Sequence, residues 1–356
     1  MISVQEALSH ITSQARSFGT QTISIEQALG RIWVQHINPN LTFALNGHPA
    51  EYIHNTEFQL LTHSLTHSYA NRKHGSNIFV SDGAVQIEED LVRSSMLCKK
   101  NQVPFAKNKW INDSCQSILA INGHNYVQVE QLPEVAIVST GNEIVAAGSV
   151  TLPHQIRDSN SYTISSSLRR FGIHSPAKAL VPDDKEALRD TITSLLNKDI
   201  LIISGGVSKG DADYVPKVLA SLGVKELFHG VKLKPGAPFW FGRTPAGGVV
   251  FGLPGNPLAL QVACRIFLEP YICACFNISP RSPILLPLAT EQMKKSKYDE
   301  FFPCKIVNTD AYSRLLPIRY NGSGDIGAAL QSNGIALQRE MHSNLPEGTL
   351  LPFYAW

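Results

Sequence analysis

The clearest alternation of apolar and polar segments lies in the middle of the chain. Short apolar runs rich in β-branched residues have the character of buried strands, and they cover residues 134–140, 177–181, 199–204 and 247–255. Segments with apolar residues at helical spacing lie between them, at residues 159–171, 183–197 and 212–223. Strands that alternate with helices in this way are typical of βαβ units. We therefore predict a mostly parallel sheet covered by helices on both faces, within residues 132–276.

The N-terminal part of the chain is less regular. Residues 3–17 place apolar side chains near helical spacing, after a Ser3 that can cap the helix together with Glu6. A second short helix is predicted from Ser24 to Gly30. The periodicity then weakens as far as residue 131, and the strand-like pieces in this stretch are residues 77–80 and 126–129.

The C-terminal part combines several prolines with short strand-like runs and has no helical pattern. It predicts a small all-β domain at residues 277–356. The predicted fold class is therefore multidomain α/β. It has a central parallel sheet covered by helices, an N-terminal mixed α+β region and a small C-terminal all-β domain.

The composition is that of a globular protein, and the charge argues against binding of nucleic acid or an anionic membrane. The 356 residues are 43% hydrophobic and 17% charged, unlike a disordered chain. The formal net charge of +2 supplies no general field for nucleic acid or an anionic membrane, so an anion must be bound locally. The N-terminus does not resemble a signal peptide and no run reaches 18 apolar residues, so we expect a cytoplasmic protein. The six cysteines have no metal or disulfide spacing and are expected to be free thiols.

The densest candidate site is the segment 204–214, SGGVSKGDADY, which follows a predicted strand and precedes a predicted helix. Ligands bind at the carboxyl ends of the strands in open parallel sheets. Glycines let the backbone approach a ligand, and the N–H groups at a helix start can hold a phosphate or another oxyanion. Asp211 and Asp213 add carboxylates suited to Mg²⁺ or to ligand hydroxyl groups. A tight turn with a capping aspartate is the alternative explanation.

Two proline-containing turns are further candidates. In KLKPGAPFWFG, residues 232–242, Lys234 can neutralise an anion beside a Pro-Gly turn, although an exposed hairpin has the same pattern. GLPGNP, residues 252–257, is a rigid turn that opens a helix with Pro257 near its first position. By itself this second turn indicates only where a helix begins.

Polar residues near two other predicted elements complete the set. Glu143 follows a strand, and Asp158 and Asn160 lie where a helix begins. If one sheet carries them, they meet Asp213 at its carboxyl edge, whereas each alone also fits a cap or a solvated side chain. His63 and His67 have the spacing of a helical metal pair, but no third ligand is fixed by the pattern.

In their order along the chain, these motifs resemble the molybdopterin molybdenumtransferase family, called MoeA in bacteria and represented by the E domain of gephyrin in animals. The resemblance rests on VAIVSTGNEI, IRDSNS, VPDD, DILIISGGVSKGDADYVPKVLASLG, KPGAPFWFG, VFGLPGNPLALQV and NGSGDIGAALQSNGIALQ. The opening ISVQEAL…ALGRI is also similar to the family's N-terminal segment, so the resemblance covers most of the chain.

The resemblance implies an activity, a set of partners and a domain organisation. Family enzymes are elongated homodimers that hydrolyse adenylylated molybdopterin with Mg²⁺, release AMP and insert molybdate to give the molybdenum cofactor. A molybdopterin adenylyltransferase and maturation proteins of molybdoenzymes are the further partners that it suggests. The implied domains are residues 1–37 with 100–131, 38–99, 132–276 and 277–356.

The resemblance also assigns roles to residues of this chain. The implied catalytic residues are Glu143, Asp183, Asp213 and Lys234, with Asp183 and Asp213 as Mg²⁺ ligands. The implied ligand-binding residues are Asp158, Asn160, Gly205, Gly206, Ser208, Gly210, Pro235, Gly236, Pro254, Gly255, Asn256, Pro257 and Ser323.

Several positions depart from the family pattern. Where family members have a segment close to NSAMDGYA, this chain has LNGHPAEY, with Pro49 in place of the aspartate and Glu51 as the nearby carboxylate. Ala237 stands where many members have a second lysine, and Tyr298 and Pro303 lie close to expected arginines. What remains is the half of the site that binds the pterin nucleotide.

These departures leave three functions open. The first is an active molybdenumtransferase. The second is a catalytically impaired paralogue that binds molybdopterin or partner enzymes. The third is a pterin-nucleotide adenylyltransferase or pyrophosphatase. Release of AMP would indicate the first function, and tight binding without turnover would indicate the second. Release of pyrophosphate would indicate the third.

Overall fold

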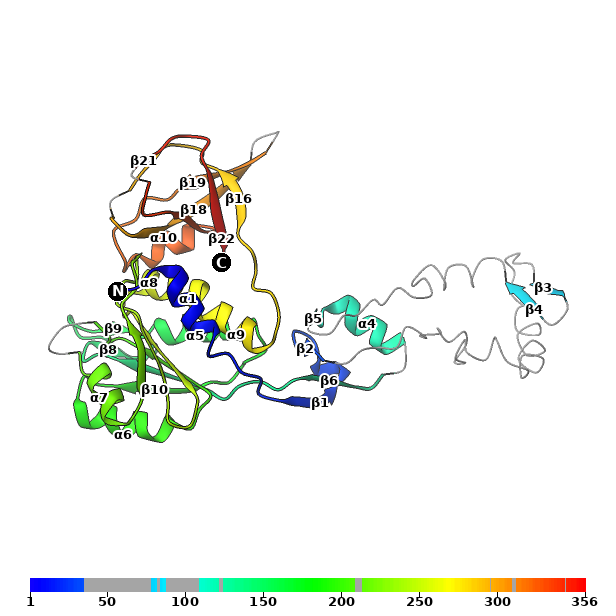
Figure 1. Ribbon diagram of the computed structural model, residues 1–356, viewed down its shortest axis with the longest axis horizontal. Coiled ribbons are helices and arrows are strands. Elements are labelled where there is room, and N and C mark those ends of the chain that lie inside the picture. Colours follow the sequence, from blue (N-terminus) through cyan, green and yellow to red (C-terminus); the bar gives the residue numbers. More distant parts are fainter. Residues whose placement is uncertain are drawn as a thin grey trace. The chain divides into compact units, whose positions relative to one another are not determined.

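The computed structural model describes residues 1–34, 78–81, 84–87, 109–121, 124–208, 213–294, 296–308, 312–342 and 344–356. Contacts divide the chain into two compact units, one of Met1–Phe18 with Leu132–Trp356 and one of Gly19–Gln131 (Figure 1). Some residues considered above lie outside the described ranges, namely Pro49, Glu51, His63, His67, Gly210 and Asp211.

A six-stranded sheet forms the centre of the first unit. In spatial order its strands are β10 (Ala177–Val181), β7 (Val135–Thr140), β11 (Ile200–Ser204), β15 (Val249–Leu253), β14 (Trp240–Arg243) and β12 (Lys225–His229). The first four strands are parallel, and β14 and β12 pair antiparallel with their neighbours. Every residue of β7, β11 and β15 is buried, as expected for a sheet covered on both faces. The predicted mostly parallel sheet is confirmed.

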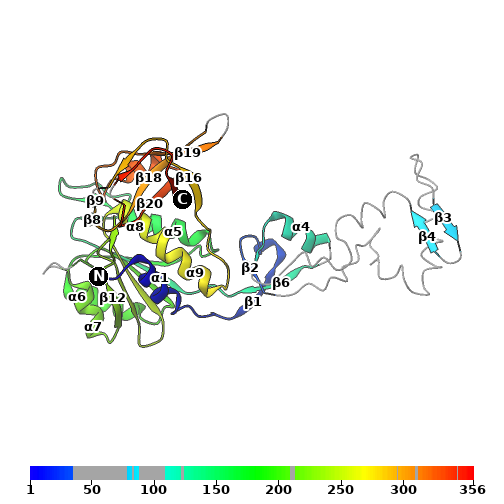
Figure 2. The ribbon, with the colours of Figure 1, turned by 45° about the horizontal axis from the view of Figure 1, so that its top comes forward.

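Helices cover both faces of this sheet. They are α1 (Val4–Thr12), α5 (Asn160–Arg169), α6 (Lys185–Leu195), α7 (Val215–Ser221), α8 (Pro257–Ala263) and α9 (Glu269–Cys275). Figure 2 shows α6 and α7 on one side of the sheet and α1, α5, α8 and α9 on the other. Leu188 of α6 and Val218 of α7 share one core cluster with Leu201 and Ile203 of β11. Successive strand residues point to opposite faces of a sheet, so Ile202 points away from Leu201 and Ile203. Ile202 is also fully buried, which shows that both faces of the sheet are covered.

One long apolar helix crosses the core of this unit. It consists of α8, a π-helical turn at Cys264–Leu268, and α9. By length and composition Pro257–Cys275 would suffice to span a membrane, but 83% of its most apolar window is buried inside the protein. Phe267 and Tyr271 pack against Phe239 and Phe251, with ring centroids 4.7 and 5.4 Å apart. Its apolar composition is therefore that of a core helix.

The cysteines in the described part of the chain are free thiols, as the sequence predicts; they are Cys115, Cys264, Cys273, Cys275 and Cys304. Burial raises the pKa of the Cys264 thiol to about 12, and the buried Glu269 carboxylate adds to this rise. A thiol that stays protonated is a poor nucleophile. Burial raises the thiol pKa at Cys273, Cys275 and Cys304 as well, so the four buried cysteines are packing residues in the same sense as small apolar side chains.

The C-terminal region is rich in strands. Its main sheet contains β13 (Leu233–Lys234), β18 (Asp299–Asn308), β20 (Gly334–Gln338), β22 (Leu350–Ala355) and β16 (Ile284–Pro287), and β19 (Ser313–Pro317) pairs with β18. A two-stranded pair is formed by β17 (Gln292–Met293) and β21 (Asn344–Leu345). The prediction of strands alone was wrong in one respect, because α10 (Ile326–Gln331) is helical. Asp325 starts this helix by accepting a hydrogen bond from the backbone N–H of Ala328.

The second unit is built on a four-stranded antiparallel sheet. Its strands in order are β1 (Thr20–Ser24), β6 (Tyr126–Glu130), β2 (Ile32–Trp33) and β5 (Lys109–Trp110). Helix α4 (Asp113–Ile121) packs near these strands, and β3 (Ile78–Ser81) pairs with β4 (Ala84–Ile87). The predicted helix from Ser24 is only a 3₁₀ turn at Ile25–Gln27, because Ser24 already belongs to β1.

The capping box of α1 gives a first prediction. Ser3 Oγ accepts from the backbone N–H of Glu6 at 3.2 Å, and Glu6 Oε2 accepts from the backbone N–H of Ser3 at 2.7 Å. Replacing Ser3 by alanine removes one of these bonds and should lower the free energy of unfolding by about 1 kcal/mol. Urea denaturation measures this change. Ser9→Ala, within the same helix, is the control and should change stability by less than about 0.5 kcal/mol; equal effects of the two substitutions would contradict the assigned cap.

Candidate functional site

A cavity of about 430 Å³ opens at the carboxyl ends of the parallel strands, and we call it the strand-edge cavity. Its lining comes from the end of β7 and from the segments that follow β7, β10, β11 and β15. The lining residues are Ser139, Thr140, Glu143, Ile144, Ile156, Arg157, Asp158, Ser159, Asn160, Asp183, Ser204, Gly205, Gly206, Val207, Ser208, Asp213, Pro238, Pro254, Gly255, Asn256 and Pro257. This is the edge at which parallel α/β sheets bind ligands.

Two consecutive glycines shape the floor of the strand-edge cavity. Gly205 and Gly206, directly after β11, have φ angles of +96° and +62°. A Cβ on Gly205 would collide with the carbonyl oxygen of Thr140, and one on Gly206 would lie 2.9 Å from Val215 Cγ2. Only glycine therefore fits the turn at Gly205, and it leaves exposed backbone where a ligand phosphate can approach.

Asn160 joins three segments of the cavity wall. Its Nδ2 donates to Ser204 Oγ at 2.8 Å and to the carbonyl oxygen of Gly255 at 2.7 Å. Its Oδ1 is buried and has no hydrogen-bond partner in the described part of the chain. A buried acceptor without a partner is costly, so Oδ1 is suited to accept an N–H or O–H group of a bound molecule.

Carboxylates surround the strand-edge cavity. Asp158 accepts from Ser139 Oγ and from the backbone N–H of Ser161, each at 3.1 Å. Asp183 Oδ1 accepts from Thr140 Oγ1 at 2.7 Å, while Oδ2 has no partner among the described residues. Glu143 is exposed at the rim, and Asp213 is half-buried. The structure thus brings together Glu143, Asp158 and Asp213, which were expected at this edge, and adds Asp183, which the resemblance implied.

A short parallel pairing holds Glu143 and Asp158 on adjacent segments. Strands β8 (Ile144–Val145) and β9 (Ile156–Arg157) form this pair. The backbone N–H of Ile156 donates to the carbonyl oxygen of Glu143, and that of Asp158 donates to Val145, both at 2.8 Å. Residues 15 positions apart in the chain therefore share one wall of the cavity.

The turn formed by Lys234, Pro235 and Gly236 does not lie in the wall of the cavity, where the resemblance implied ligand-binding residues. Lys234, Pro235 and Gly236 do not line the strand-edge cavity, whereas Pro238 of the same segment does. Lys234 belongs to β13 and is in register with Glu300 of β18. The turn nevertheless adjoins the cavity, since a Cβ on Gly236 would lie 3.9 Å from Pro254 Cγ.

Ser323 reaches the rim of the cavity from the C-terminal region. Its Oγ accepts from Asn256 Nδ2 at 2.7 Å, and its carbonyl oxygen accepts from the backbone N–H of Ala259 at 3.1 Å. Ser323 is therefore one hydrogen bond away from a lining residue.

Several lining residues were not predicted from the sequence to contact a ligand. The hydroxyl groups of Ser139, Thr140 and Ser204 and the guanidinium of Arg157 are among them. Ser139, Thr140 and Ser204 are the last residues of β7 and β11, so their position at strand ends was the signal that could have identified them.

The chain is similar to known proteins of molybdopterin biosynthesis. Residues 136–274 match the family model described as a probable molybdopterin binding domain. The chain is 33% identical over 263 residues to a molybdopterin molybdenumtransferase of Synechocystis sp., covering 73% of this chain and 65% of that protein. It is 40% identical over 168 residues to the Nostoc sp. protein of the same name, covering 46% of this chain and 38% of the relative. The chain thus spans less than two thirds of the length of either relative.

The fold of the chain is also similar to that of a molybdopterin biosynthesis protein of known structure. A crystal structure of the molybdopterin biosynthesis moea protein from Pyrococcus horikoshii superposes with a TM-score of 0.70 and 21% identity, covering 100% of this chain and 99% of that one. The multidomain α/β fold predicted from the sequence is therefore shared with a MoeA protein. The chain is therefore similar in sequence to molybdopterin molybdenumtransferases, and it has the fold of a MoeA protein.

Proposed function

We propose that this protein is a molybdopterin molybdenumtransferase that acts in molybdenum cofactor biosynthesis. Its substrates would be adenylylated molybdopterin and molybdate, and its products AMP and molybdenum cofactor. The main support is the strand-edge cavity, whose lining combines Gly205, Gly206, Asn160 and four carboxylates. The names of the related proteins agree with this proposal.

Each group around the cavity has a role in this proposal. The backbone N–H of Gly206 binds a phosphate oxygen, while that of Gly205 already donates to the carbonyl oxygen of Leu253. Asn160 Oδ1 accepts a hydrogen bond from the bound nucleotide. Hydrolysis adds the oxygen of water to one phosphorus and breaks the bond from that phosphorus to the bridging oxygen. The protons of water end on the product phosphates or in solvent, and Glu143 at the rim is placed to accept one.

Mg²⁺ is part of the proposal. The described residues contain no group of three His, Cys, Asp or Glu side chains placed to hold a metal by themselves. Mg²⁺ is commonly bound by one or two carboxylates together with substrate phosphates and water, and the unpartnered Oδ2 of Asp183 fits that mode. Asp183 and Asp213 would hold the ion, which supplies positive charge to the phosphates when bound.

The partners and location are proposals as well. We propose a cytoplasmic homodimer in which the partner subunit completes each site, with a molybdopterin adenylyltransferase as supplier of the substrate. Light scattering of the full chain should give twice the 39.0 kDa monomer mass. A monomer mass at assay concentrations would contradict the dimer.

A second candidate function is binding without turnover. It is favoured by the position of Lys234 outside the lining of the strand-edge cavity and by the half-buried Ala237 in the same turn. Such a protein would hold molybdopterin or its adenylylated form through the Gly205–Gly206 turn and pass it to another enzyme.

One experiment separates these functions. The full chain is incubated with adenylylated molybdopterin, Mg²⁺ and molybdate, and AMP and molybdenum cofactor are measured by chromatography. The proposed transferase should release AMP in proportion to the cofactor formed. Binding by calorimetry without AMP release would identify the second function. Release of pyrophosphate would instead indicate an adenylyltransferase or pyrophosphatase, and neither binding nor turnover would contradict every one of these assignments.

A further inference from the structure

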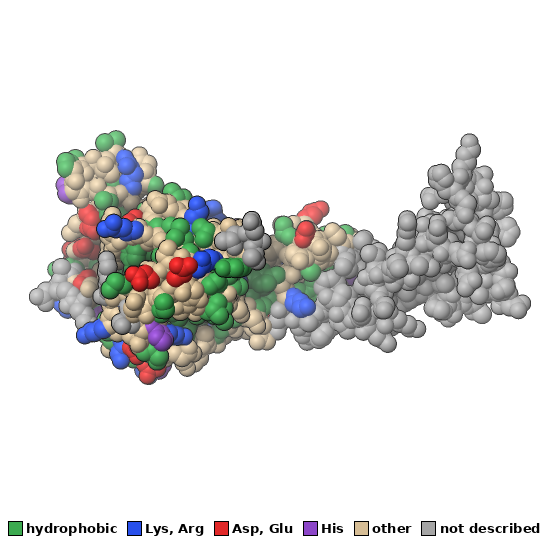
Figure 3. All heavy atoms as spheres, turned by 90° about the horizontal axis from the view of Figure 1, so that it is seen from above, with side chains coloured by type: hydrophobic (Ala, Val, Ile, Leu, Met, Phe, Trp, Pro, Cys, Tyr) green, Lys and Arg blue, Asp and Glu red, His purple; other side chains and the backbone are tan. Residues whose placement is uncertain are grey.

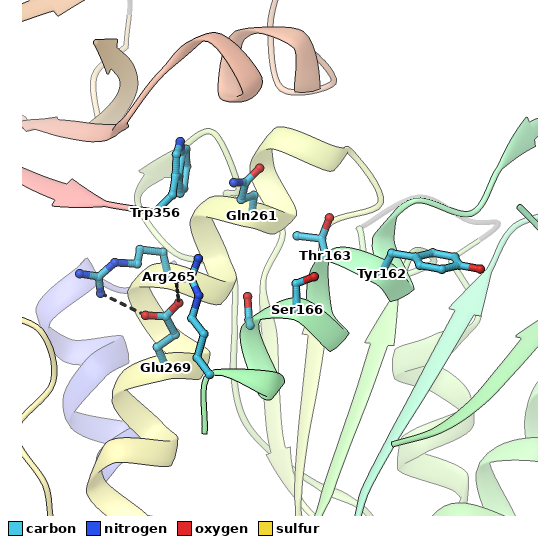
Figure 4. A pocket seen from close by; sticks show the side chains of 9 residues that line it. Tyr162, Thr163, Ser166, Gln261, Arg265, Glu269 and Trp356 are labelled. Atoms are coloured by element: carbon cyan, nitrogen blue, oxygen red, sulfur yellow. Dashed lines mark hydrogen bonds and ion pairs between the residues drawn. The ribbon is translucent and has the colours of Figure 1, made fainter. Parts of the chain in front are cut away.

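A second cavity, of about 310 Å³, lies between α5 and the long helix α8–α9, and we call it the arginine cavity (Figure 4). Arg170 and Ser166 line it from the α5 side, Gln261, Arg265 and Glu269 line it from the long helix, and Trp356 lines it from the C-terminal end. It shares no lining residue with the strand-edge cavity.

Positive charge exceeds negative charge at this cavity. The Glu269 side chain is only 6% exposed and pairs with three guanidinium groups. Its Oε1 lies 3.2 Å from Arg170 Nη1, and its Oε2 lies 3.5 Å from Arg265 Nη1 and 3.0 Å from Arg281 Nη2. Among the side chains, one carboxylate therefore meets three guanidinium groups. Arg281 also donates to the main-chain oxygen of Trp356, a residue of the cavity lining.

Several donors at the cavity are not used by the protein itself. The Arg170 guanidinium makes one hydrogen bond, to Glu269, and the side chain is 44% exposed. The hydroxyl of Ser166 and the amide of Gln261 have no hydrogen-bond partner among the residues that the structure describes. A guanidinium has five N–H donors, so most of those on Arg170 remain available to a ligand.

Arg265, in contrast, is held rigidly. Its Nε donates to the carbonyl oxygen of Ala355 at 2.9 Å and its Nη2 to that of Arg281 at 3.3 Å. It lies on the π-helical turn Cys264–Leu268, which precedes Pro270 in α9. Such turns within α-helices occur frequently at functional sites. Here the turn holds a buried cation at the wall of a cavity.

We propose that the arginine cavity binds a small oxyanion, either free phosphate or the terminal phosphate of a small molecule. Arg170 and Arg265 supply the charge, and Ser166 and Gln261 supply neutral donors, a combination that recognises phosphate oxygens. Trp356 forms an aromatic wall for the remainder of a phosphate ester. The inference does not depend on the proposed transferase activity.

Calorimetry on the full chain at constant ionic strength tests this inference, with inorganic phosphate and glycerol 3-phosphate as separate probes. Each probe should bind saturably, and tighter binding of one of them identifies the source of the oxyanion. Arg170→Gln should weaken binding at least tenfold, because it removes a charge-assisted hydrogen bond. Arg169→Gln removes the same charge from the preceding exposed residue and is the matched control, expected to change affinity less than twofold.

Folding is checked with the same proteins. Glu269 keeps Arg265 and Arg281 as partners in Arg170→Gln, so its thermal unfolding midpoint should stay close to that of the parent chain. If it does not, Gln261→Leu provides a variant that leaves all charges in place and should weaken binding about three- to tenfold. No saturable binding, or equal affinity of Arg170→Gln and Arg169→Gln, would show that the cluster only joins helices.

Discussion

Replacing Asp183 by asparagine should lower AMP release by about a hundredfold or more, because the substitution removes a negative charge at the place where Mg²⁺ and the phosphates are proposed to meet. The carboxamide keeps the size of the side chain, and its oxygen can still accept from Thr140 Oγ1. The thermal unfolding midpoint should therefore remain near that of the parent protein. The Mg²⁺ concentration for half-maximal rate should rise.

Asp184→Asn is the matched control for this prediction. Asp184 is adjacent in sequence, is exposed and does not line the strand-edge cavity. It caps α6 by accepting from the backbone N–H of Ala187 at 2.8 Å, a task that asparagine performs equally well. Its AMP release should stay within about twofold of the parent rate. A rate for Asp183→Asn similar to that of Asp184→Asn would remove Asp183 from the proposed machinery.

The second large effect is expected at Gly205. A methyl group there would collide with the carbonyl oxygen of Thr140, and a φ of +96° is strained for any residue with a Cβ. Gly205→Ala should therefore lower the free energy of unfolding by about 3 kcal/mol. At this size of folded unit the loss corresponds to a fall of roughly 6–12 °C in the unfolding midpoint.

Calorimetric unfolding of Gly205→Ala measures this loss. Gly148→Ala is the control, since a Cβ at Gly148 meets no atom within 4 Å and its φ is not in the left-handed region. That substitution should change stability by no more than about 0.5 kcal/mol. An unchanged midpoint for Gly205→Ala would mean that the turn can relax, and the turn would then not be the rigid phosphate cradle proposed here.

The elements of the parallel sheet could be predicted because their signals are local. The β-branched run at Val135–Thr140 and the helical pattern at Lys185–Leu195 each fit a single conformation. Helix α10 was missed because its six residues are too few to show helical periodicity, and its start depends on the side chain of Asp325. Ser24 was predicted to cap a helix, but it lies in β1, which pairs with β6 about 100 residues away. A pairing between such distant segments gives no signal in the local sequence.

The candidate site could also be predicted in part from the sequence. The rule that ligands bind at the carboxyl ends of parallel strands placed Glu143, Asp158 and Asp213 around one edge, and the structure brings them there. Asp183, which lines the same cavity, was assigned only through the family resemblance. Lys234 could not be placed by that rule. It belongs to a strand that pairs with β18 of the C-terminal region, and such a pairing is set by contacts between distant segments.

The sequence by itself determined the order of strands and helices, the glycine turn after β11 and the set of acidic residues at the strand ends. Only the tertiary structure decided that Asn160 bonds to Gly255, 95 residues away, and thereby leaves Oδ1 buried without a partner. It also decided that Glu269, besides its neighbour Arg265 one helical turn away, meets Arg170 and Arg281 from other segments. Periodicity reports the neighbours of a residue within one element, whereas these contacts arise when separate elements pack, and packing depends on the whole chain.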